Sequence, residues 1–171
     1  MEVNGHKIEP GAKLSGADLS GADLGGANLY GSDLTYANLT GVNLDDADLT
    51  GTNLRGALLR GASLEFTELG STDLSGVQMQ GANLDGANLA LANLFTANCE
   101  GVNLGGANLR GANLMLTYLF TADLSGASLR HANLERANLE RANLMDADLT
   151  GANLSAAMLR GATMPDGSIH D

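Results

Sequence analysis

The residues that could do chemistry in this chain of 171 residues are few and lie far apart. Histidine occurs at His6, His131 and His170, and Cys99 is the single cysteine. A nucleophile needs a base within hydrogen-bond reach, and no such pair is suggested, because Cys99 occupies an inward position of the repeat described below. No zinc-protease, phosphate-loop or dinucleotide-binding motif occurs. We therefore predict no catalytic residue, no cofactor and no metal site, and we expect that the protein is not an enzyme.

Acidic side chains form the one regular cluster of reactive groups. Asp45, Glu65 and Asp85 are spaced 20 residues apart, and Asp46 follows the first of them. A column of carboxylates could attract Ca²⁺, but Ca²⁺ prefers roughly six to eight oxygens wrapped around it, and a flat column offers few. We interpret this candidate acidic column as a solvated surface that keeps the chain soluble. Like charges at strand spacing repel, so we expect no folding benefit from it.

A repeat of five residues must position these groups. From Leu14 to Met164 every fifth residue is Leu, and the three exceptions among 31 positions are Met79, Cys99 and Met164. Two residues before this centre stands Ala at 23 of 31 positions, replaced only by Ser, Thr or Val. Such a steric filter indicates a tightly packed interior. We therefore predict that these two columns point inward and that the other positions face outward.

The outward positions have preferences of their own. The residue before the centre is Asn 15 times and Asp seven times, and the residue two after it is Gly at 17 of 30 positions. Gly at this density disfavours a helix, because each one costs roughly 1 kcal/mol there, and the inward spacing does not match the strand period of two. Gly supplies the positive φ of tight turns, and Asn also suits turns. The pattern predicts a coil that bends after every unit, with Asn making hydrogen bonds at the corners.

The unit resembles the pentapeptide-repeat family, whose repeat is written A-(D/N)-L-x-x. Two segments match that pattern in full: Ala17-Asp18-Leu19-Ser20-Gly21 and Ala107-Asn108-Leu109-Arg110-Gly111. The resemblance covers about residues 12–164. It implies an all-β fold, a right-handed quadrilateral parallel β-helix with four units per turn, so that 31 units give close to eight coils. The tail from Met164 to Asp171 resembles endings of cyanobacterial members.

The register divides the chain into three expected parts: an N-terminal cap (1–11), the β-helix (12–164) and a C-terminal cap (165–171). The ends of a solenoid expose unpaired backbone and an open core, which must be covered. Val3 and Ile8 give the first cap apolar side chains. The second begins at Pro165, and Ile169 keeps the five-residue register. We therefore expect the Ile169 side chain to plug the last coil.

Charge and hydropathy limit the partners. The formal net charge of −11 disfavours nucleic acid as a ligand. No stretch approaches the roughly 20 apolar residues of a membrane span, and no apolar run typical of a signal peptide occurs near the start. One cysteine cannot form an internal disulfide, so nothing indicates an oxidising compartment. We expect a cytoplasmic monomer or weak dimer whose partner is another protein, with no nucleic acid and no membrane bound.

One candidate surface follows from the predicted stacking of residues 20 apart. Phe95 then lies under Met115, and the adjoining face carries Tyr118 and Phe120 beside Leu116 at the corner. Contiguous exposed apolar surface marks a contact site more often than isolated residues do. The contact patch is defined as Phe95, Met115, Leu116, Tyr118 and Phe120. The alternative is that these residues are loosely scattered, or that the aromatic rings lie flat over the coil wall, and that they bind nothing.

An uneven charge distribution offers a second function. Residues 14–100 carry eleven acids and two bases, whereas residues 101–164 carry five of each. Fluoroquinolone-resistance members of the family bind type II topoisomerases with an acidic rod, so the resemblance offers DNA mimicry as an alternative. Coils about 4.8 Å apart make this rod ~37 Å long. One net charge per roughly 3.4 Å is then about half the density of duplex DNA, at one per 1.7 Å.

We therefore expect a non-catalytic, rigid β-helical scaffold or protein–protein interaction module. The resemblance permits a regulatory role, since some cyanobacterial members regulate cell differentiation by binding other proteins. The topoisomerase-binding members commonly have Phe centres, loop insertions or a C-terminal dimerisation helix, and this chain has none of these. A gyrase supercoiling assay separates the two alternatives.

Overall fold

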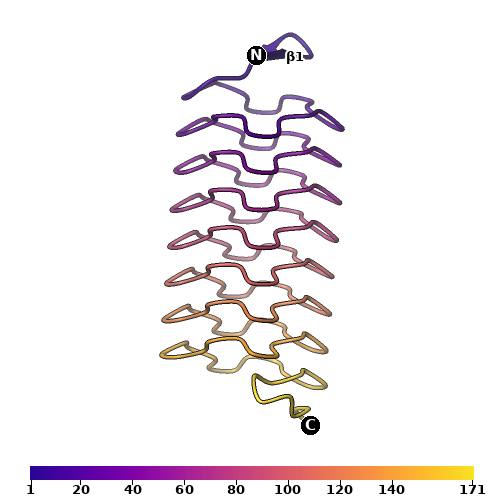
Figure 1. Cartoon of the computed structure of the whole chain (residues 1–171), viewed down its shortest axis with the longest axis vertical. Coiled ribbons are helices and arrows are strands. Elements are labelled where there is room, and N and C mark those ends of the chain that lie inside the picture. The colour runs from indigo at the N-terminus through magenta and orange to yellow at the C-terminus, as the bar shows by residue number, and fades with distance from the viewer.

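The chain winds into a rod of stacked four-sided coils, as the computed structural model of residues 1–171 shows (Figure 1). Every parallel bridge joins residues 20 apart, as between Asp18 and Asn38, so one coil takes four units. Two short strands, β1 (Glu2–Val3) and β2 (His6–Lys7), form an antiparallel hairpin at the N-terminal end. The predicted quadrilateral parallel β-helix is confirmed. None of its segments forms a helix that could cross a membrane.

Three backbone hydrogen bonds join each unit before the last coil to the coil that follows, and in one of them the corner N–H of Gly16 donates to the carbonyl of Thr35 at 2.8 Å. The N–H of Leu14 donates to the carbonyl of Asp33 at 2.7 Å, and the N–H of Asp33 donates back to the carbonyl of Ala12 at 2.9 Å. The pattern recurs along the rod with little change in distance. Because donors and acceptors pair with the neighbouring coils, the backbone can enclose an apolar core without unpaired groups inside.

Each corner is a four-residue turn with one left-handed residue. The N–H of Ala17 donates to the carbonyl of Leu14 at 3.0 Å, and Gly16 between them has a φ of 69°. A positive φ at the third residue is typical of a type II turn and favours Gly. The 13 corner positions without Gly also have positive φ values: Tyr36, Asp46, Phe66, Ser71, Leu91, Thr96, Leu116, Thr121, His131, Arg136, Arg141, Asp146 and Ala156. The turn therefore imposes its geometry on whatever residue stands there.

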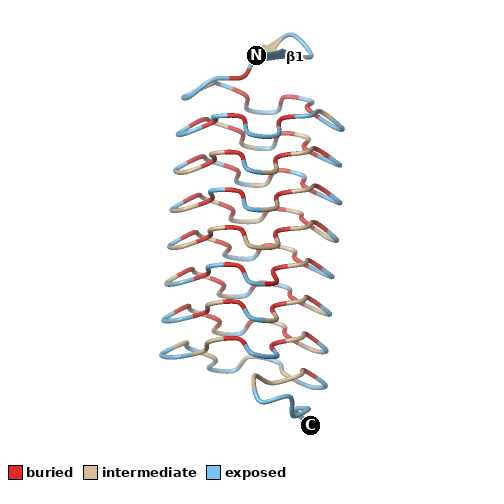
Figure 2. Ribbon diagram, in the orientation of Figure 1, coloured by how far each residue is buried: buried red, intermediate tan, exposed pale blue.

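The two inward columns form one continuous core, drawn in red in Figure 2. The core cluster contains 49 buried residues, nearly all from the Leu and Ala columns. The substitutions Met79 and Cys99 are buried as well, at 1% and 0% exposure. Hydroxyl groups in the small column are satisfied, because Thr67 donates to the carbonyl of Leu44 at 2.8 Å and its counterparts do likewise. The prediction of two inward columns is confirmed.

The Asn and Asp column makes the expected corner hydrogen bonds. Oδ1 of Asn93 accepts the backbone N–H of Phe95 at 3.3 Å, and Nδ2 of Asn113 donates to Oδ1 of Asn93 at 2.9 Å. These bonds form an Asn ladder that fixes each turn and links successive coils. Where the ladder holds Asp18, hydrogen bonds from the side chain and then the backbone of Ser20 lower the pKa of its carboxyl. The ladder is structural, as predicted.

Large corner side chains lie over the Gly one coil further on. Two ring carbons of Phe66 lie 2.6 Å and 2.7 Å from the position that a Cβ on Gly86 would take. Three other corners have the same pairing: Tyr36 over Gly56, Leu91 over Gly111 and His131 over Gly151. Gly at these positions is favoured twice, by its positive φ and by the side chain that covers it.

Replacing Gly86 by alanine should therefore destabilise the protein more than replacing Gly106. Both residues have positive φ values, 63° and 60°, so each alanine incurs the left-handed strain of roughly 1–2 kcal/mol. Nothing lies within 4 Å of a Cβ at Gly106, whereas the Phe66 ring must leave Gly86. Losing about 40 Å² of apolar contact adds about 1 kcal/mol. Chemical denaturation of both variants measures the difference in the free energy of unfolding. Equal losses of stability in the two variants would contradict a role for the Phe66 contact. So would a larger loss at Gly86 that remains when Phe66→Ala is combined with it.

The two ends of the rod differ. At the N-terminal end Ile8 is 5% exposed, and Val3 of β1 packs against the core. At the other end the three leucines of the last coil are only partly buried, and Figure 2 shows this coil mostly in tan and pale blue. We propose that residues 1–11 and 165–171 act as caps, the second covering its end only in part.

The prediction for Ile169 is wrong. Its side chain is 61% exposed and does not plug the last coil. The chain reverses after Pro165, so that Ile169 forms an antiparallel bridge with Thr163. The N–H of Gly161 donates to the carbonyl of His170 at 2.7 Å and holds the reversed tail in place. Because the register of five requires a continuing coil, it no longer applies once the chain has turned back.

Candidate protein-contact site

The contact patch lies where the Asn ladder is interrupted. The second face carries the units centred on every twentieth residue from Leu19. On this face Tyr118 replaces the usual Asn or Asp, so the N–H of Phe120 has no acceptor within the protein. The same face lacks Asn or Asp in three other coils, at Leu58, Gln78 and Met158. In these coils the second face therefore has larger side chains and lacks the corner hydrogen bonds that Asn or Asp would accept.

The rings of Tyr118 and Phe120 stack on each other. Their centroids lie 6.1 Å apart with the planes inclined by 23°, a separation within the range of favourable aromatic pairs. One coil further on, Cζ of Arg141 lies 5.8 Å from the centroid of Phe120, which is within cation–π distance. Tyr118 is 38% exposed, whereas Phe120 is half-buried between its neighbours. These contacts hold the aromatic surface in one arrangement.

The adjoining face contributes the other three residues of the patch. The N–H of Thr96 donates to the carbonyl of Met115 at 3.2 Å, which places Phe95 and Met115 on adjacent coils. Phe95 is 38% exposed and Leu116 is 41% exposed, while Met115 is half-buried. Leu116 occupies the corner between the faces with a φ of 58°. The structure thus brings the five predicted residues to one edge of two successive coils, with parts of their side chains against the wall.

Backbone strain occurs at two corners, one on each side of the second face. Thr96 and Thr121, which follow Phe95 and Phe120 in the sequence, both have a φ of 56°. They are the only β-branched residues among the 13 corner residues with positive φ that are not Gly. Such a conformation is a genuine outlier for a β-branched residue. The hydroxyl of each donates to the carbonyl of the residue before it at 2.7 Å, which partly offsets the strain.

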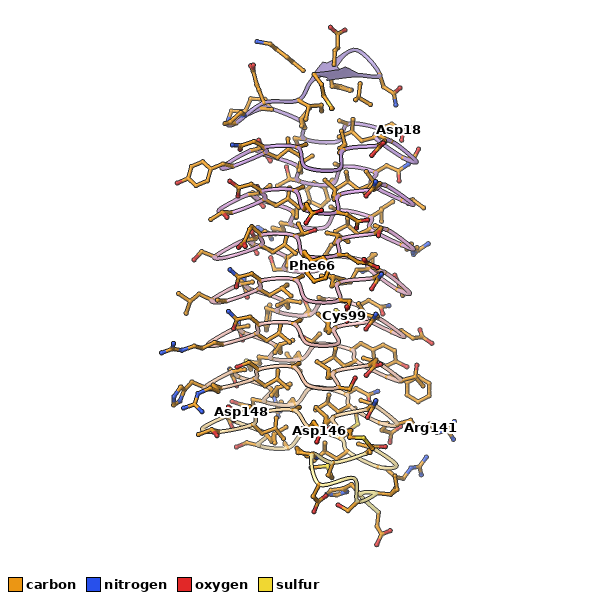
Figure 3. The ribbon with its side chains drawn as sticks, viewed as in Figure 1. Asp18, Phe66, Cys99, Arg141, Asp146 and Asp148 are labelled. Atoms are coloured by element: carbon orange, nitrogen blue, oxygen red, sulfur yellow. The ribbon has the colours of Figure 1, made fainter.

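Two arginines border the patch toward the C-terminal end. Arg136 stands one coil beyond Leu116 in the same corner column, and Arg141 reaches outward from its own corner (Figure 3). Both are exposed and neither forms an ion pair. By contrast, Nη1 of Arg130 lies 3.0 Å from Oδ2 of Asp148. The two guanidinium groups beside the patch are therefore free to contact a partner.

The candidate acidic column is engaged in hydrogen bonds rather than simply solvated. Oδ1 of Asp45 accepts the hydroxyl of Ser63 at 2.7 Å and the backbone N–H of Glu65 at 2.9 Å. Glu65 in turn accepts a hydrogen bond from Nδ2 of Asn83. Asp45 thus supplies the acceptor that Ser63, standing in the ladder position, cannot. The expectation of no folding benefit considered only the repulsion between charges and missed these bonds.

The rest of that column contributes no chemistry. The carboxylate of Asp85 lies over Gly105, 2.7 Å from the position of a Cβ there, and Asp46 is exposed at a corner. No group of three or more His, Cys, Asp or Glu side chains is placed to hold a metal ion. The column therefore stays a candidate surface whose observed contacts all lie within the β-helix.

The remaining reactive groups are dispersed. Cys99 is fully buried, and burial raises the pKa of its thiol to about 12. His131 covers a corner Gly, while His6 lies in β2 and His170 in the reversed tail. A shallow depression is lined by three residues at another corner: Ala90, Leu91 and Arg110. None of these groups is brought together with a second one that could act on a substrate.

Sequence reasoning placed the five patch residues on two successive coils but missed the arginines that border them. Stacking residues 20 apart puts Arg136 directly after Leu116, so the signal was present in the sequence. The contact between Arg141 and Phe120 had no such signal, because the two stand in neighbouring columns rather than in one. The sequence shows Tyr118 in place of the usual Asn or Asp, but the resulting lack of an acceptor for the Phe120 N–H follows only from the hydrogen-bond geometry.

The architecture is that of a solenoid protein, a right-handed quadrilateral β-helix whose variable side chains all lie on the outer walls. The model of the Pentapeptide repeats family matches with 8 copies, and the matched ranges overlap to span residues 12–161. The chain therefore belongs to the pentapeptide repeat family.

Solved structures include several similar proteins. HetL, a pentapeptide repeat protein involved in heterocyst differentiation regulation from the cyanobacterium Nostoc sp. strain PCC 7120, is 35% identical over 92% of this chain and 87% of its own, with a TM-score of 0.27. QnrB1, a plasmid-mediated fluoroquinolone resistance protein, is 23% identical over 89% of this chain and 85% of its own, with a TM-score of 0.67. A pentapeptide repeat protein from the Arabidopsis thaliana thylakoid lumen is 27% identical over 68% and 71%, with a TM-score of 0.46. A search of curated protein sequences found no match.

Proposed function

We propose that this chain is a non-catalytic protein-interaction module, a rigid β-helix that binds another protein through the contact patch. The observation that carries the proposal is that the exposed apolar side chains lie next to two strained corners, one on each side of the second face. Thr96 and Thr121 hold a conformation that costs a β-branched residue roughly 1–3 kcal/mol, and such strain clusters at functional sites. Gly is the usual residue at these corners and would relieve the strain.

The composition of the patch supports the same proposal. Tyr, Phe, Met and Arg are the residue types that are enriched in protein interfaces and in their energetic hot spots. Tyr118 and Phe120 are already ordered by their stacking and by Arg141. A partner would therefore lose little entropy in fixing these rings, which favours binding.

Replacing Phe95, Tyr118 and Phe120 by serine should abolish capture of the partner from an extract of the source organism. Removing three aromatic anchors costs several kcal/mol of binding energy, so we expect at least a tenfold loss in the amount captured. Quantitative mass spectrometry of proteins retained by the immobilised chain measures the loss.

The chain offers a matched control for this experiment. Its other three aromatic residues, Tyr30, Tyr36 and Phe66, are 57%, 66% and 59% exposed and lie outside the patch. Replacing them by serine removes a similar amount of aromatic surface and should leave capture unchanged. If both triple variants retain the same proteins in the same amounts, the patch is not the binding surface. Far-UV circular dichroism of each variant checks that the β-helix is intact.

DNA mimicry has no comparable observation in its favour. The similarity to QnrB1 at 23% identity concerns the fold alone. Part of the acidic surface, at Asp45 and Glu65, is engaged in hydrogen bonds within the β-helix. The contact patch, by contrast, keeps Phe95, Leu116 and Tyr118 exposed to solvent. We therefore favour the contact patch.

A further inference from the structure

We infer that the contact patch binds an apolar peptide segment that carries an acidic side chain at the end facing the C-terminal coils. The inference rests on the proposed function and adds the chemistry and the direction of the partner. It follows from which charged groups around the patch are already paired and which are free.

The free positive charge lies on one side of the patch. Arg136 follows Leu116 in its corner column, Arg141 lies over Phe120, and neither forms an ion pair. A guanidinium group binds a carboxylate in a bidentate arrangement that a partner acid can complete. An interface that covered these arginines without such an acid would bury unpaired charge, which is costly.

The acids nearest to these arginines do not neutralise them. Glu140 is half-buried, and its Oε1 lies 3.8 Å from Nε of Arg160, so this carboxylate has a partner elsewhere. Glu135 is also half-buried and forms no ion pair, whereas Arg136 is exposed at the corner beside it. The outermost charges on this side are therefore positive, and they are what a partner meets first.

The other side of the patch has the opposite character. Glu100 precedes Phe120 in its column, is exposed and forms no ion pair. Residues 14–100 carry eleven acids and two bases, so an acidic group of the partner is repelled there. Charges of opposite sign on the two sides fix the direction of a bound segment, because complementary potentials select the orientation as well as the partner. A basic residue of the partner would fit beside Glu100.

A protein segment suits this surface better than a nucleic acid. Stacked aromatic residues with arginines can also hold unpaired bases. However, a nucleic-acid strand carries a charge at every nucleotide and would extend over the acidic coils before residue 100. A short peptide can place a single acid beside Arg136 and Arg141 and keep the remainder apolar.

Selection from a phage-displayed library of random 12-residue peptides tests the inference. The enriched peptides should contain aromatic or aliphatic residues together with Asp or Glu. A synthetic enriched peptide should bind the double variant Arg136→Glu, Arg141→Glu at least tenfold more weakly than the unmodified protein. Replacing the acid of the peptide by lysine should restore binding to that variant. The matched control is Arg55→Glu, Arg60→Glu, which changes the net charge equally on the same two faces but several coils away, and it should have little effect.

Each outcome has a distinct meaning. If enriched peptides bind and are lost with the serine triple variant of the patch, but carry no acid or are insensitive to the Arg136 and Arg141 changes, the inference is wrong while the proposed function stands. If no peptide is enriched, or binding survives the triple variant, both are wrong. Competition by a 12-nucleotide oligothymidine at the peptide's own concentration would show a nucleic-acid site and overturn the inference.

Discussion

Truncating Leu74 to alanine should lower the free energy of unfolding by about 3 kcal/mol, within the usual range of roughly 2–5 kcal/mol for a buried leucine. Its side chain is fully buried, in a column where the leucine of one coil packs on that of the next. The loss combines the apolar transfer energy with the cavity that remains, because the surrounding β-helix cannot collapse without breaking its backbone ladder. Urea denaturation followed by circular dichroism measures the change.

Leu154 provides the matched comparison. It stands four coils further along the same column but in the last coil, where its side chain is only partly buried. In a solenoid each repeat contacts only its neighbours, so Leu154 has a packed neighbour on one side, whereas Leu74 has one on both. We expect Leu154→Ala to cost about half as much as Leu74→Ala. Equal losses at the two positions would mean that the last coil is covered as well as the middle of the rod.

The inward columns could be predicted from the sequence because they depend on size alone. A position that holds only Ala, Ser, Thr or Val is predicted to lie in a confined interior. Ala92 and Thr72 are both buried, as this rule predicts. The corner turn could also be predicted, from the recurring Gly. The sequence did not show, however, that Leu91 and Thr121 adopt the same left-handed conformation as the corner glycines. Their conformation is imposed by the hydrogen bonds of the turn, which override the local preference of the residue.

Both ends of the chain were harder to predict. The dipeptide Asn4-Gly5 favours a tight hairpin, and both residues have positive φ values between β1 and β2. That signal was available but unused. The prediction for the C-terminal tail was wrong for another reason. Ile169 keeps the five-residue spacing, but it lies beyond the turn at Pro165 and pairs antiparallel with Thr163. Spacing predicts position only while the chain continues to wind.

The candidate site was predictable as a set of residues but not as a surface. Stacking by 20 residues placed Phe95 beside Met115 without any structure. How far each side chain stands out from the wall depends on contacts between columns, as when Phe120 becomes half-buried between Tyr118 and Arg141. Such contacts join residues whose spacing is not a multiple of the repeat, so a periodic argument cannot find them.

Alkaline pH should destabilise the protein through Cys99 in particular. Burial raises the pKa of its thiol to about 12 in the folded state, whereas a cysteine in an unfolded chain ionises near 8.5. The raised pKa means that the folded state keeps the proton while the unfolded state loses it. The stabilisation from this difference is therefore complete below about pH 8.5 and is lost as the pH rises toward 12. The expected loss is about 1.4 kcal/mol for each pH unit above 9, or about 3 kcal/mol at pH 11.

The variant Cys99→Val isolates this effect, because it removes the ionisable group and keeps a small buried apolar side chain. All other residues are the same in the two proteins, so the contributions of the rest of the chain cancel when the two free energies of unfolding are subtracted. Urea denaturation at pH 8, 9, 10 and 11 should show the original protein losing stability relative to the variant above about pH 9. Parallel profiles would mean that the folded thiol ionises as readily as a free one, and hence that solvent reaches the core at Cys99.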